Sequence, residues 1–164
     1  MKRQNGFTLV EILVVVFLLG IIVIVGSNLF FSILKGASKA EIEKEVKQNG
    51  DYAMNVMERM VRNAQEILQN SDGQTCESSM NKIKIKNPDG GETEFAFTGT
   101  RIASSGAYLT SENTALFSGA FSCDQTRTPP VVTISFTLSQ AGTKERPEEK
   151  AQASFSTTVS LRSY

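Results

Sequence analysis

The fold of this chain is decided by the stretch Gly6-Phe7-Thr8-Leu9-Val10-Glu11 and by the run from Ile12 to Leu34 that follows it. That run contains 23 residues and no charged side chain. An α-helix rises about 1.5 Å per residue, so a helix of this length crosses a hydrocarbon core of roughly 30 Å. The sequence therefore predicts a membrane-spanning helix near the N-terminus.

A cleaved secretory signal is the alternative interpretation of the same run. The apolar region of such a signal usually has about 7 to 15 residues and ends at a small-residue cleavage site. The nearest candidate site, Ser38-Lys39-Ala40, lies beyond Lys35. The length of the run favours a helix that stays in the mature protein.

Glu11 is the one ionisable side chain among apolar neighbours, since Val10 precedes it and Ile12 follows it. A charged side chain at the middle of a membrane helix costs an estimated 2.5 to 3.5 kcal/mol. Two interpretations stay open from the residues alone. Either an opposite charge pairs with Glu11, or the carboxylate lies near a helix start, where the macrodipole and interfacial water stabilise it.

The N-terminal residues resemble the class III signal of type IV prepilins and pseudopilins, with the basic leader Met1-Lys2-Arg3-Gln4-Asn5 before Gly6-Phe7-Thr8-Leu9-Val10-Glu11-Ile12-Leu13. The resemblance implies that prepilin peptidase cleaves between Gly6 and Phe7 on the cytoplasmic face and that Phe7 is then N-methylated. It also implies that Glu11 meets the new N-terminal ammonium of a neighbouring subunit during assembly. Such pairing is physically sensible, because each unpaired charge in an apolar bundle costs several kcal/mol.

Two further positions refine the resemblance. Gly20 matches a glycine that is common in these helices, whereas Asn28 stands where many major pilins have a proline. The departure at Asn28 gives no support for a helix kink there. It favours a minor subunit over a shaft-forming major pilin.

Composition excludes several classes of function. The chain has 17 basic and 17 acidic residues, and loss of Lys2 and Arg3 with the leader leaves 15 against 17, so no basic surface for nucleic acid is expected. Zinc sites and Cys/His or Ser/His catalytic pairs need residues that the chain lacks, because it has no histidine and only two cysteines. We expect no metal, no cofactor and no enzymatic activity.

The two cysteines, Cys76 and Cys123, form a possible disulfide, because an even pair in an exported domain is typically bonded. Two buried free thiols are the alternative. The orientation of the chain rests on the family resemblance, because positive charges lie on both sides of the span and do not by themselves place the C-terminus outside.

Helical spacing of apolar residues continues from Ala37 to about Gln69, which predicts an amphipathic extension of the helix. The apolar stripe comprises Ile42, Val46, Ala53, Val56, Met60, Ala64 and Ile67, with Met57, Val61 and Leu68 beside it. Gly50 is the expected weak point, at a cost of about 1 kcal/mol relative to alanine. Asn70-Ser71-Asp72-Gly73 supplies the stop signals.

Beyond the helix the period of the pattern changes to two. Residues 82–86 and 92–97 flank the turn Asn87-Pro88-Asp89-Gly90-Gly91, which predicts a hairpin with opposite charges on its polar face. Shorter strands are expected at residues 101–103 and 115–122, with a turn or short helix at 108–113 between them. Residues 131–138 and 153–162 are expected to pair as an antiparallel hairpin across a polar loop. The ending Thr157 to Tyr164 resembles the terminal strand of minor pilins and pseudopilins of the W and J kinds.

Together these features predict an α+β, pilin-like fold, with a long helix packed on an antiparallel sheet of about five or six strands. The expected organisation is a leader at 1–6, a transmembrane and assembly helix at 7–34, its amphipathic half at 35–70 and a periplasmic or extracellular β-rich domain at 71–164. Exposed aromatic residues from Phe117 to Phe121 are candidates for binding, although core filling is the favoured use.

The predicted function is that of a structural subunit of a type IV pilus or of a type II secretion or competence pseudopilus. We expect one pass through the inner membrane, with the C-terminal domain outside the cytoplasm. The expected partners are prepilin peptidase/methyltransferase, other pilin or pseudopilin subunits, the inner-membrane assembly platform and membrane lipid. The alternative is a single-span, membrane-anchored binding module that does not assemble into a filament.

Overall fold

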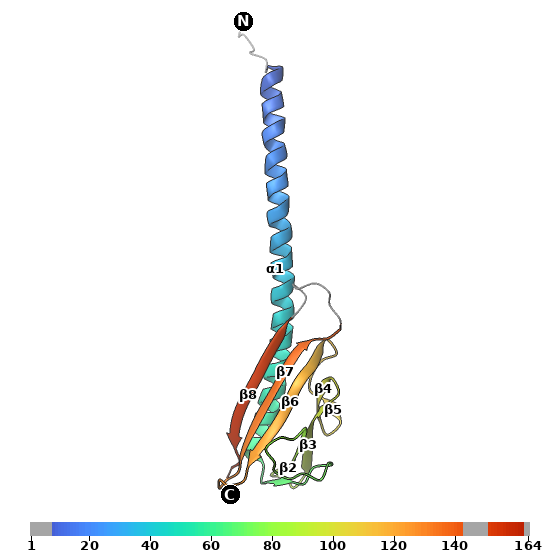
Figure 1. Ribbon diagram of the computed structural model, residues 1–164, viewed down its shortest axis with the longest axis vertical. Coiled ribbons are helices and arrows are strands. Elements are labelled where there is room, and N and C mark those ends of the chain that lie inside the picture. Colours follow the sequence, from blue (N-terminus) through green and yellow to red (C-terminus); the bar gives the residue numbers. More distant parts are fainter. Residues whose placement is uncertain (1–7, 143–150, 163–164) are drawn as a thin grey trace. The chain divides into compact units, whose positions relative to one another are not determined.

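The computed structural model describes residues 8–142 and 151–162. Within these residues the chain forms one long helix, α1 (Leu9–Asn63), followed by eight strands (Figure 1). The strands are β1 (Glu66–Leu68), β2 (Lys82–Lys86), β3 (Glu92–Thr98), β4 (Arg101–Ser104), β5 (Ala107–Tyr108), β6 (Thr114–Asp124), β7 (Val131–Gln140) and β8 (Gln152–Ser160). The α+β architecture predicted from the sequence is confirmed, and it is consistent with the pilin fold.

The chain divides into two compact units, residues 1–38 and 39–164, and each is described by itself. In the first unit, residues 9–38 form the beginning of α1, and Thr8 precedes the helix. The helix passes through Asn28 without interruption. An asparagine keeps the backbone N–H that a proline would remove, so the helical hydrogen bonding can continue there.

In the second unit, α1 ends six residues earlier than predicted, at Asn63 instead of about Gln69. Glu66–Leu68 instead forms β1, in which Ile67 pairs with Ile85 of β2. The backbone N–H of Gln65 already donates to the carbonyl of Lys86, at 2.9 Å. Ile67 lies three residues after Ala64 and so continued the helical pattern, but a strand of three residues is too short to show a period of two.

The buried stripe of α1 is rotated by about one position from the predicted one. Its members are Val46, Gly50, Ala53, Met54, Met57 and Val61, whereas the predicted Val56 and Met60 are only half-buried. Gly50 belongs to this stripe, and a Cβ atom there would overlap the ring of Phe155 from β8. Gly50 is therefore required for packing, a role that helix propensity alone did not predict.

The first sheet is a meander of five antiparallel strands in the order β1-β2-β3-β4-β5. The predicted hairpin is confirmed as β2 and β3, in which Lys84 stands opposite Glu94. Within the hairpin, Lys84 pairs with Glu92 at 2.6 Å, as the predicted opposite charges require. The other two lysines of β2 pair outside the hairpin, Lys82 with Asp72 of the β1–β2 connection at 2.7 Å and Lys86 with Glu66 of β1 at 2.9 Å. Ile83 and Ile85, on the other face, are buried in the core.

The second sheet has three antiparallel strands in the order β6-β7-β8, and its β7–β8 hairpin confirms the predicted pairing. The number of strands was underestimated, because the short strands β1 and β5 were not expected. Tyr108, predicted to begin a turn or a short helix, belongs to β5. The predicted strand at 115–122 is part of the longer β6, which contains a register shift between Leu116 and Ser118.

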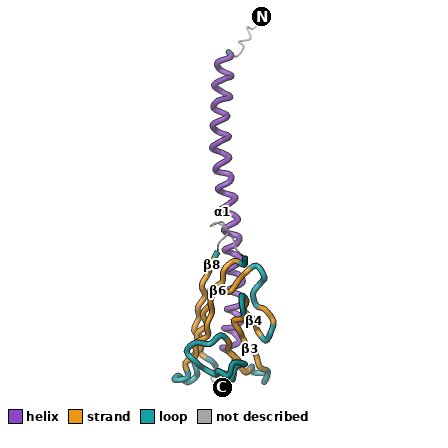
Figure 2. Tube along the Cα trace, turned by 45° about the vertical axis from the view of Figure 1, so that its right-hand side comes forward, coloured by secondary structure: helices purple, strands orange, loops and turns teal. Residues whose placement is uncertain are grey.

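The two sheets and the last turns of α1 enclose one apolar core, and both views show these turns alongside the strands (Figures 1 and 2). A bridge between Met80 and Phe121 joins β6 to the segment before β2. Rings fill the space between the sheets, with Phe97 stacked on Phe121 at 4.4 Å between centroids. Phe121 is therefore a core residue, as favoured, whereas Phe117 is 72% exposed and is not.

Candidate functional site

The first candidate site is the apolar surface at the beginning of α1. Every side chain from residue 9 to residue 34 is exposed in the isolated chain, Leu9 to 81% and Phe17 to 65%. By length and composition this part of α1 can cross a membrane. Apolar surface on this scale is unfavourable in water, so it calls for lipid or other apolar helices around it.

Thr8 sets the start of this helix. The backbone N–H of Glu11 donates to the Thr8 hydroxyl at 3.3 Å and to the Thr8 carbonyl at 3.1 Å, which is the arrangement of an N-cap. The Thr8-x-x-Glu11 spacing is a known helix-start signal that the sequence prediction did not use. The cap places Glu11 in the first turn, where the positive end of the helix dipole favours a carboxylate.

Glu11 makes no ion pair within the described residues, and its neighbours Val10 and Ile12 are 69% and 52% exposed. The carboxylate therefore sits on the outer surface of the apolar helix and not in a pocket of its own unit. This arrangement leaves its acceptor oxygens available to a cationic group of another molecule.

Ser27, Gly20 and Gly26 lie on the same apolar part of α1. The Ser27 hydroxyl donates to the carbonyl of Val23 at 2.8 Å, so its hydrogen bond is satisfied within the helix. A Cβ atom added at Gly20 or Gly26 would meet nothing within 4 Å. Glycines on an exposed face of a membrane helix let a second helix approach closely.

The predicted cleavage site at Gly6 and Phe7, with the methylation of Phe7, lies outside the described residues. It stays a prediction. The domain boundaries at 6, 34 and 70 likewise stay predictions of organisation, although the helix itself ends at Asn63.

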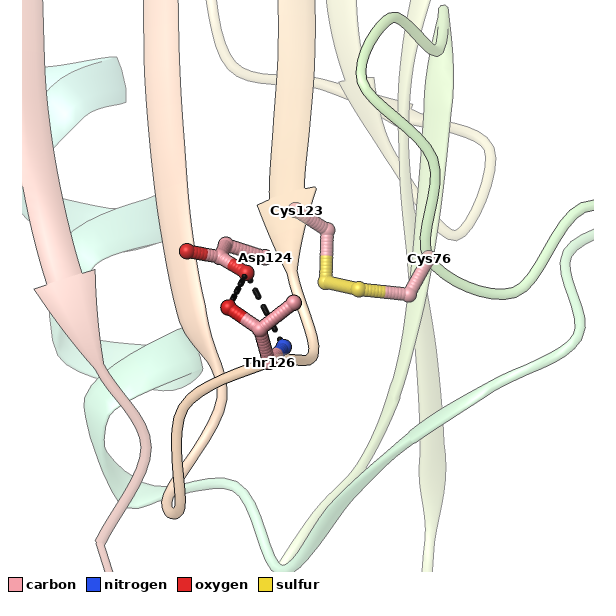
Figure 3. The surroundings of a disulfide bond; sticks show 4 residues. All are labelled: Cys76, Cys123, Asp124 and Thr126. Atoms are coloured by element: carbon pink, nitrogen blue, oxygen red, sulfur yellow. Dashed lines mark hydrogen bonds between the residues drawn. A yellow bond between two sulfur atoms is a disulfide. The ribbon is translucent and has the colours of Figure 1, made fainter.

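In the second unit, Cys76 and Cys123 are joined by a disulfide, with their Cα atoms 5.0 Å apart (Figure 3). Cys76 lies in the segment between β1 and β2, and Cys123 lies near the end of β6. The backbone N–H of Cys123 also donates to the carbonyl of Glu77 at 2.8 Å. Of the two alternatives that the sequence left open, the structure has the bonded one, and the bond fastens the long β1–β2 connection to the second sheet.

Asp124, next to the disulfide, organises the turn that leaves β6 (Figure 3). Its Oδ1 accepts from the Thr126 hydroxyl at 2.6 Å and from the Thr126 backbone N–H at 2.9 Å. These hydrogen bonds, the hydroxyl's first, hold the pKa of Asp124 below its ordinary value, and the charge of Arg127 adds to the effect. The arrangement is that of a turn-stabilising aspartate, because all of its partners lie within three residues.

Within the described residues, no three Cys, Asp or Glu side chains gather as a metal site would require. Charged groups of the first sheet are instead paired, Lys84 with Glu92 across strands and Lys82 with Asp72 of the turn after β1. Lys84 and Glu92 belong to the hairpin face that the sequence predicts, and the geometry of both pairs suits a structural role.

Residues 1–27 match the family model described as the prokaryotic N-terminal methylation motif. No curated protein and no solved structure matches the chain. The matched segment covers the basic leader, Glu11 and the apolar run as far as Ser27, and the long N-terminal helix fits it. The chain therefore carries the class III signal of type IV pilin-like proteins, the signal that prepilin peptidase processes.

Proposed function

We propose that this protein is a minor structural subunit of a type IV pilus or of a type II secretion or competence pseudopilus. The observation that carries the proposal is the methylation motif at residues 1–27, continued by an apolar helix that is exposed on all sides in the isolated chain. Such a helix is held by lipid before assembly and by the helices of other subunits afterwards. In this proposal, inner-membrane localisation and contact with an assembly platform follow from the same helix.

Glu11 supplies the specific contact in this proposal. Cleavage after Gly6 gives Phe7 a new ammonium group, and this group on one subunit neutralises the Glu11 carboxylate of the next. Each charge would cost several kcal/mol if it stayed unpaired among apolar helices, so the pairing favours one axial register over others. The Thr8 cap supports this role, because it holds Glu11 in the first helical turn.

A minor role is supported by Asn28, which leaves α1 continuous where many major pilins have a proline. The resemblance of the β8 region to the terminal strand of the W and J kinds points the same way. Type IV pilin-like proteins are typically structural, and we propose a structural role for this one. The partners in this role are prepilin peptidase/methyltransferase and other pilin or pseudopilin subunits.

The decisive variant is Glu11→Ala in the intact chain. We expect normal processing but at least a tenfold loss of the protein from sheared filaments, because the neighbouring ammonium loses its partner. Immunoblots of the filament and membrane fractions measure both quantities. Glu41→Ala is the matched control, since Glu41 is an exposed carboxylate of the same helix outside the apolar run. Wild-type incorporation of Glu11→Ala would refute the pairing.

The N-terminal mass of the membrane-extracted protein tests the first step. We expect a chain that begins with N-methylated Phe7, and we expect Gly6→Leu to block the cut by adding bulk beside the scissile bond. A membrane-anchored binding module makes the opposite prediction, with residues 1–6 retained and no effect of Glu11. A native protein that keeps its first six residues would overturn the proposed function.

A further inference from the structure

The middle of the outer face of the second sheet is built mainly of hydroxyl side chains. The strand registers place them in rows across β6, β7 and β8, which lie side by side (Figure 1). One row is Ser118–Thr137–Ser154, the next is Ala120–Ser135–Ser156 and the third is Ser122–Thr133–Thr158. These nine residues are called the hydroxyl face below, and all of them are exposed or half-buried.

The nine residues of the hydroxyl face include no charged side chain, although the chain has 17 basic and 17 acidic residues. The next row of the same ladder, Asp124–Val131–Ser160, brings in one charged side chain at the edge of this face. The first sheet shows the ordinary alternative, because its polar face carries Lys82, Lys84 and Lys86 beside acidic partners. Mixed charges are what a surface that only faces water usually presents. Strand propensity explains threonine but not the many serines, since serine is not among the favoured strand residues. The polar faces of the two sheets therefore differ in kind: the first is charged and the middle of the second is neutral.

Several of the hydroxyls are held in fixed orientations. Thr133 and Thr158 share a hydrogen bond of 3.1 Å across strands, and Thr137 and Ser154 share one of 3.0 Å. A hydroxyl has one donor and two acceptor sites, so these bonds fix the side chains and leave further capacity for a ligand. The side-chain hydroxyl of Ser156 makes no hydrogen bond to the described residues.

A groove of about 360 Å³ lies at the centre of this face and is lined from all three strands, by Ser118, Ser135, Ser154 and Ser156 among others. Phe117, the extra residue at the register shift of β6, precedes Ser118 and is 72% exposed. An exposed aromatic ring therefore belongs to the same strand segment as the groove. A sugar ring has hydroxyl groups that can hydrogen-bond to side-chain hydroxyls, and it has an apolar C–H face that can pack on an aromatic ring.

We infer that the hydroxyl face binds a neutral polysaccharide. Sugar hydroxyls both donate and accept, so they match side-chain hydroxyls in either sense. A charged partner, such as a polyanion or the ion-pair-rich surface of another protein, would lose its water against a face that offers no opposite charge. The inference concerns the second unit only and does not depend on the proposed filament role.

The test uses the full chain in detergent, incubated with insoluble cellulose, chitin and amylose, and with alginate beads as the anionic comparison. We expect retention on at least one neutral polymer and none on alginate. Ser156→Glu puts a charge at the groove and is expected to weaken retention at least tenfold. Ser78→Glu, an exposed serine outside the face, is the matched control and is expected to bind as the wild type does.

Thermal melts followed by circular dichroism show whether each variant stays folded. Phe117→Ser serves as the second variant, since residue 117 has no partner in the strand ladder, and it is expected to lose retention as well. Failure of the wild type on all three neutral polymers would overturn the inference, as would equal retention of folded Ser156→Glu or tighter binding to alginate. Self-association of the protein that Ser156→Glu abolishes, without polysaccharide binding, would assign the face to a second copy instead.

Discussion

Gly50 disfavours the isolated helix but is required for the packing of the folded protein. In an isolated helix, glycine costs about 1 kcal/mol relative to alanine. In this protein the backbone at Gly50 lies directly against the ring of Phe155, and the residue is buried. A residue that weakens the helix locally is therefore what lets the helix and β8 meet.

We accordingly predict that Gly50→Ala destabilises the second unit, by about 1 to 3 kcal/mol, because the added methyl group forces Phe155 or the helix to move. Urea unfolding of the full chain in detergent measures the change. Gly36→Ala is the control, since a Cβ at Gly36 meets nothing within 4 Å, and it is expected to be neutral or slightly stabilising. A Gly50→Ala protein as stable as the wild type would show that the contact with Phe155 is not tight.

Asn70 is a second residue whose role the sequence did not reveal. The sequence predicts it as part of a helix stop signal, whereas in the structure its buried side chain organises the segment after β1. The amide nitrogen donates to the carbonyl of Lys82 at 2.8 Å, and Oδ1 accepts from the N–H groups of Asp72 and Gln74 at 3.0 and 2.9 Å. One side chain thus satisfies three backbone groups.

For Asn70→Ala we expect a loss of about 1 to 3 kcal/mol of unfolding free energy, because partly buried backbone groups lose their partners. Asn81→Ala, which removes an exposed amide nearby in sequence, is expected to change little. Hydrogen exchange at Asp72 and Gln74 gives a local readout, and both amides should exchange faster in Asn70→Ala. Unchanged protection there would contradict the assigned role.

At the scale of elements, the ion pairs of the first sheet give stability a dependence on alkaline pH. The pKa of Lys82 is raised above 10.5 mainly by its hydrogen bond to Asp72, and that of Lys84 mainly by its hydrogen bond to Glu92. The folded protein therefore holds these protons more tightly than the unfolded chain. The resulting stabilisation is complete below pH 10.5, the ordinary pKa of lysine, and it is lost as the pH rises through the higher pKa values of the folded protein.

We predict that the double variant Lys82→Met, Lys84→Met melts below the wild type at neutral pH and that the gap narrows above pH 10.5. The effect is modest and shrinks with added salt, because both lysines are at the surface. Melting curves at several pH values measure the gap, with Lys47→Met as a control on an exposed helix lysine. A gap that stays constant through the alkaline range would rule out this linkage.

At the scale of the whole molecule, the disulfide closes a long segment. Cys76 and Cys123 are 47 residues apart, and the bond between them ties the connection before β2 to the end of β6. A cross-link over a loop of this size restricts the unfolded chain and is typically worth about 2 to 4 kcal/mol. Its loss should weaken the union of the two sheets, which otherwise depends on core packing and a few backbone hydrogen bonds.

We therefore predict that the double variant Cys76→Ser, Cys123→Ser unfolds at lower denaturant and loses about 2 to 4 kcal/mol. Reductant should shift the wild type toward the variant and leave the variant unchanged. Denaturation with and without reductant provides the comparison. A wild-type midpoint that does not respond to full reduction would show that the bond contributes little.

Local patterns were enough to determine much of this protein. Twenty-three uncharged residues after Glu11 specify a membrane-length helix whatever follows them, and the class III signal is read directly from contiguous residues. Alternation likewise identified the hairpin at 82–97 and the last pair of strands, because a period of two depends on neighbours along the chain.

Tertiary structure decided what depends on residues far apart in the chain. The helix stops at Asn63 because β2 offers a partner to Glu66–Leu68, and Gly50 is needed because Phe155 packs on it. Phe117 is exposed while Phe121 is buried because Phe117 is the extra residue at the register shift of β6, whereas Phe121 is paired in the regular ladder. The rows of the hydroxyl face exist only once three strands are aligned. Local spacing fixes which way a side chain points along its own element, whereas burial and partnership are fixed by the elements that pack against it.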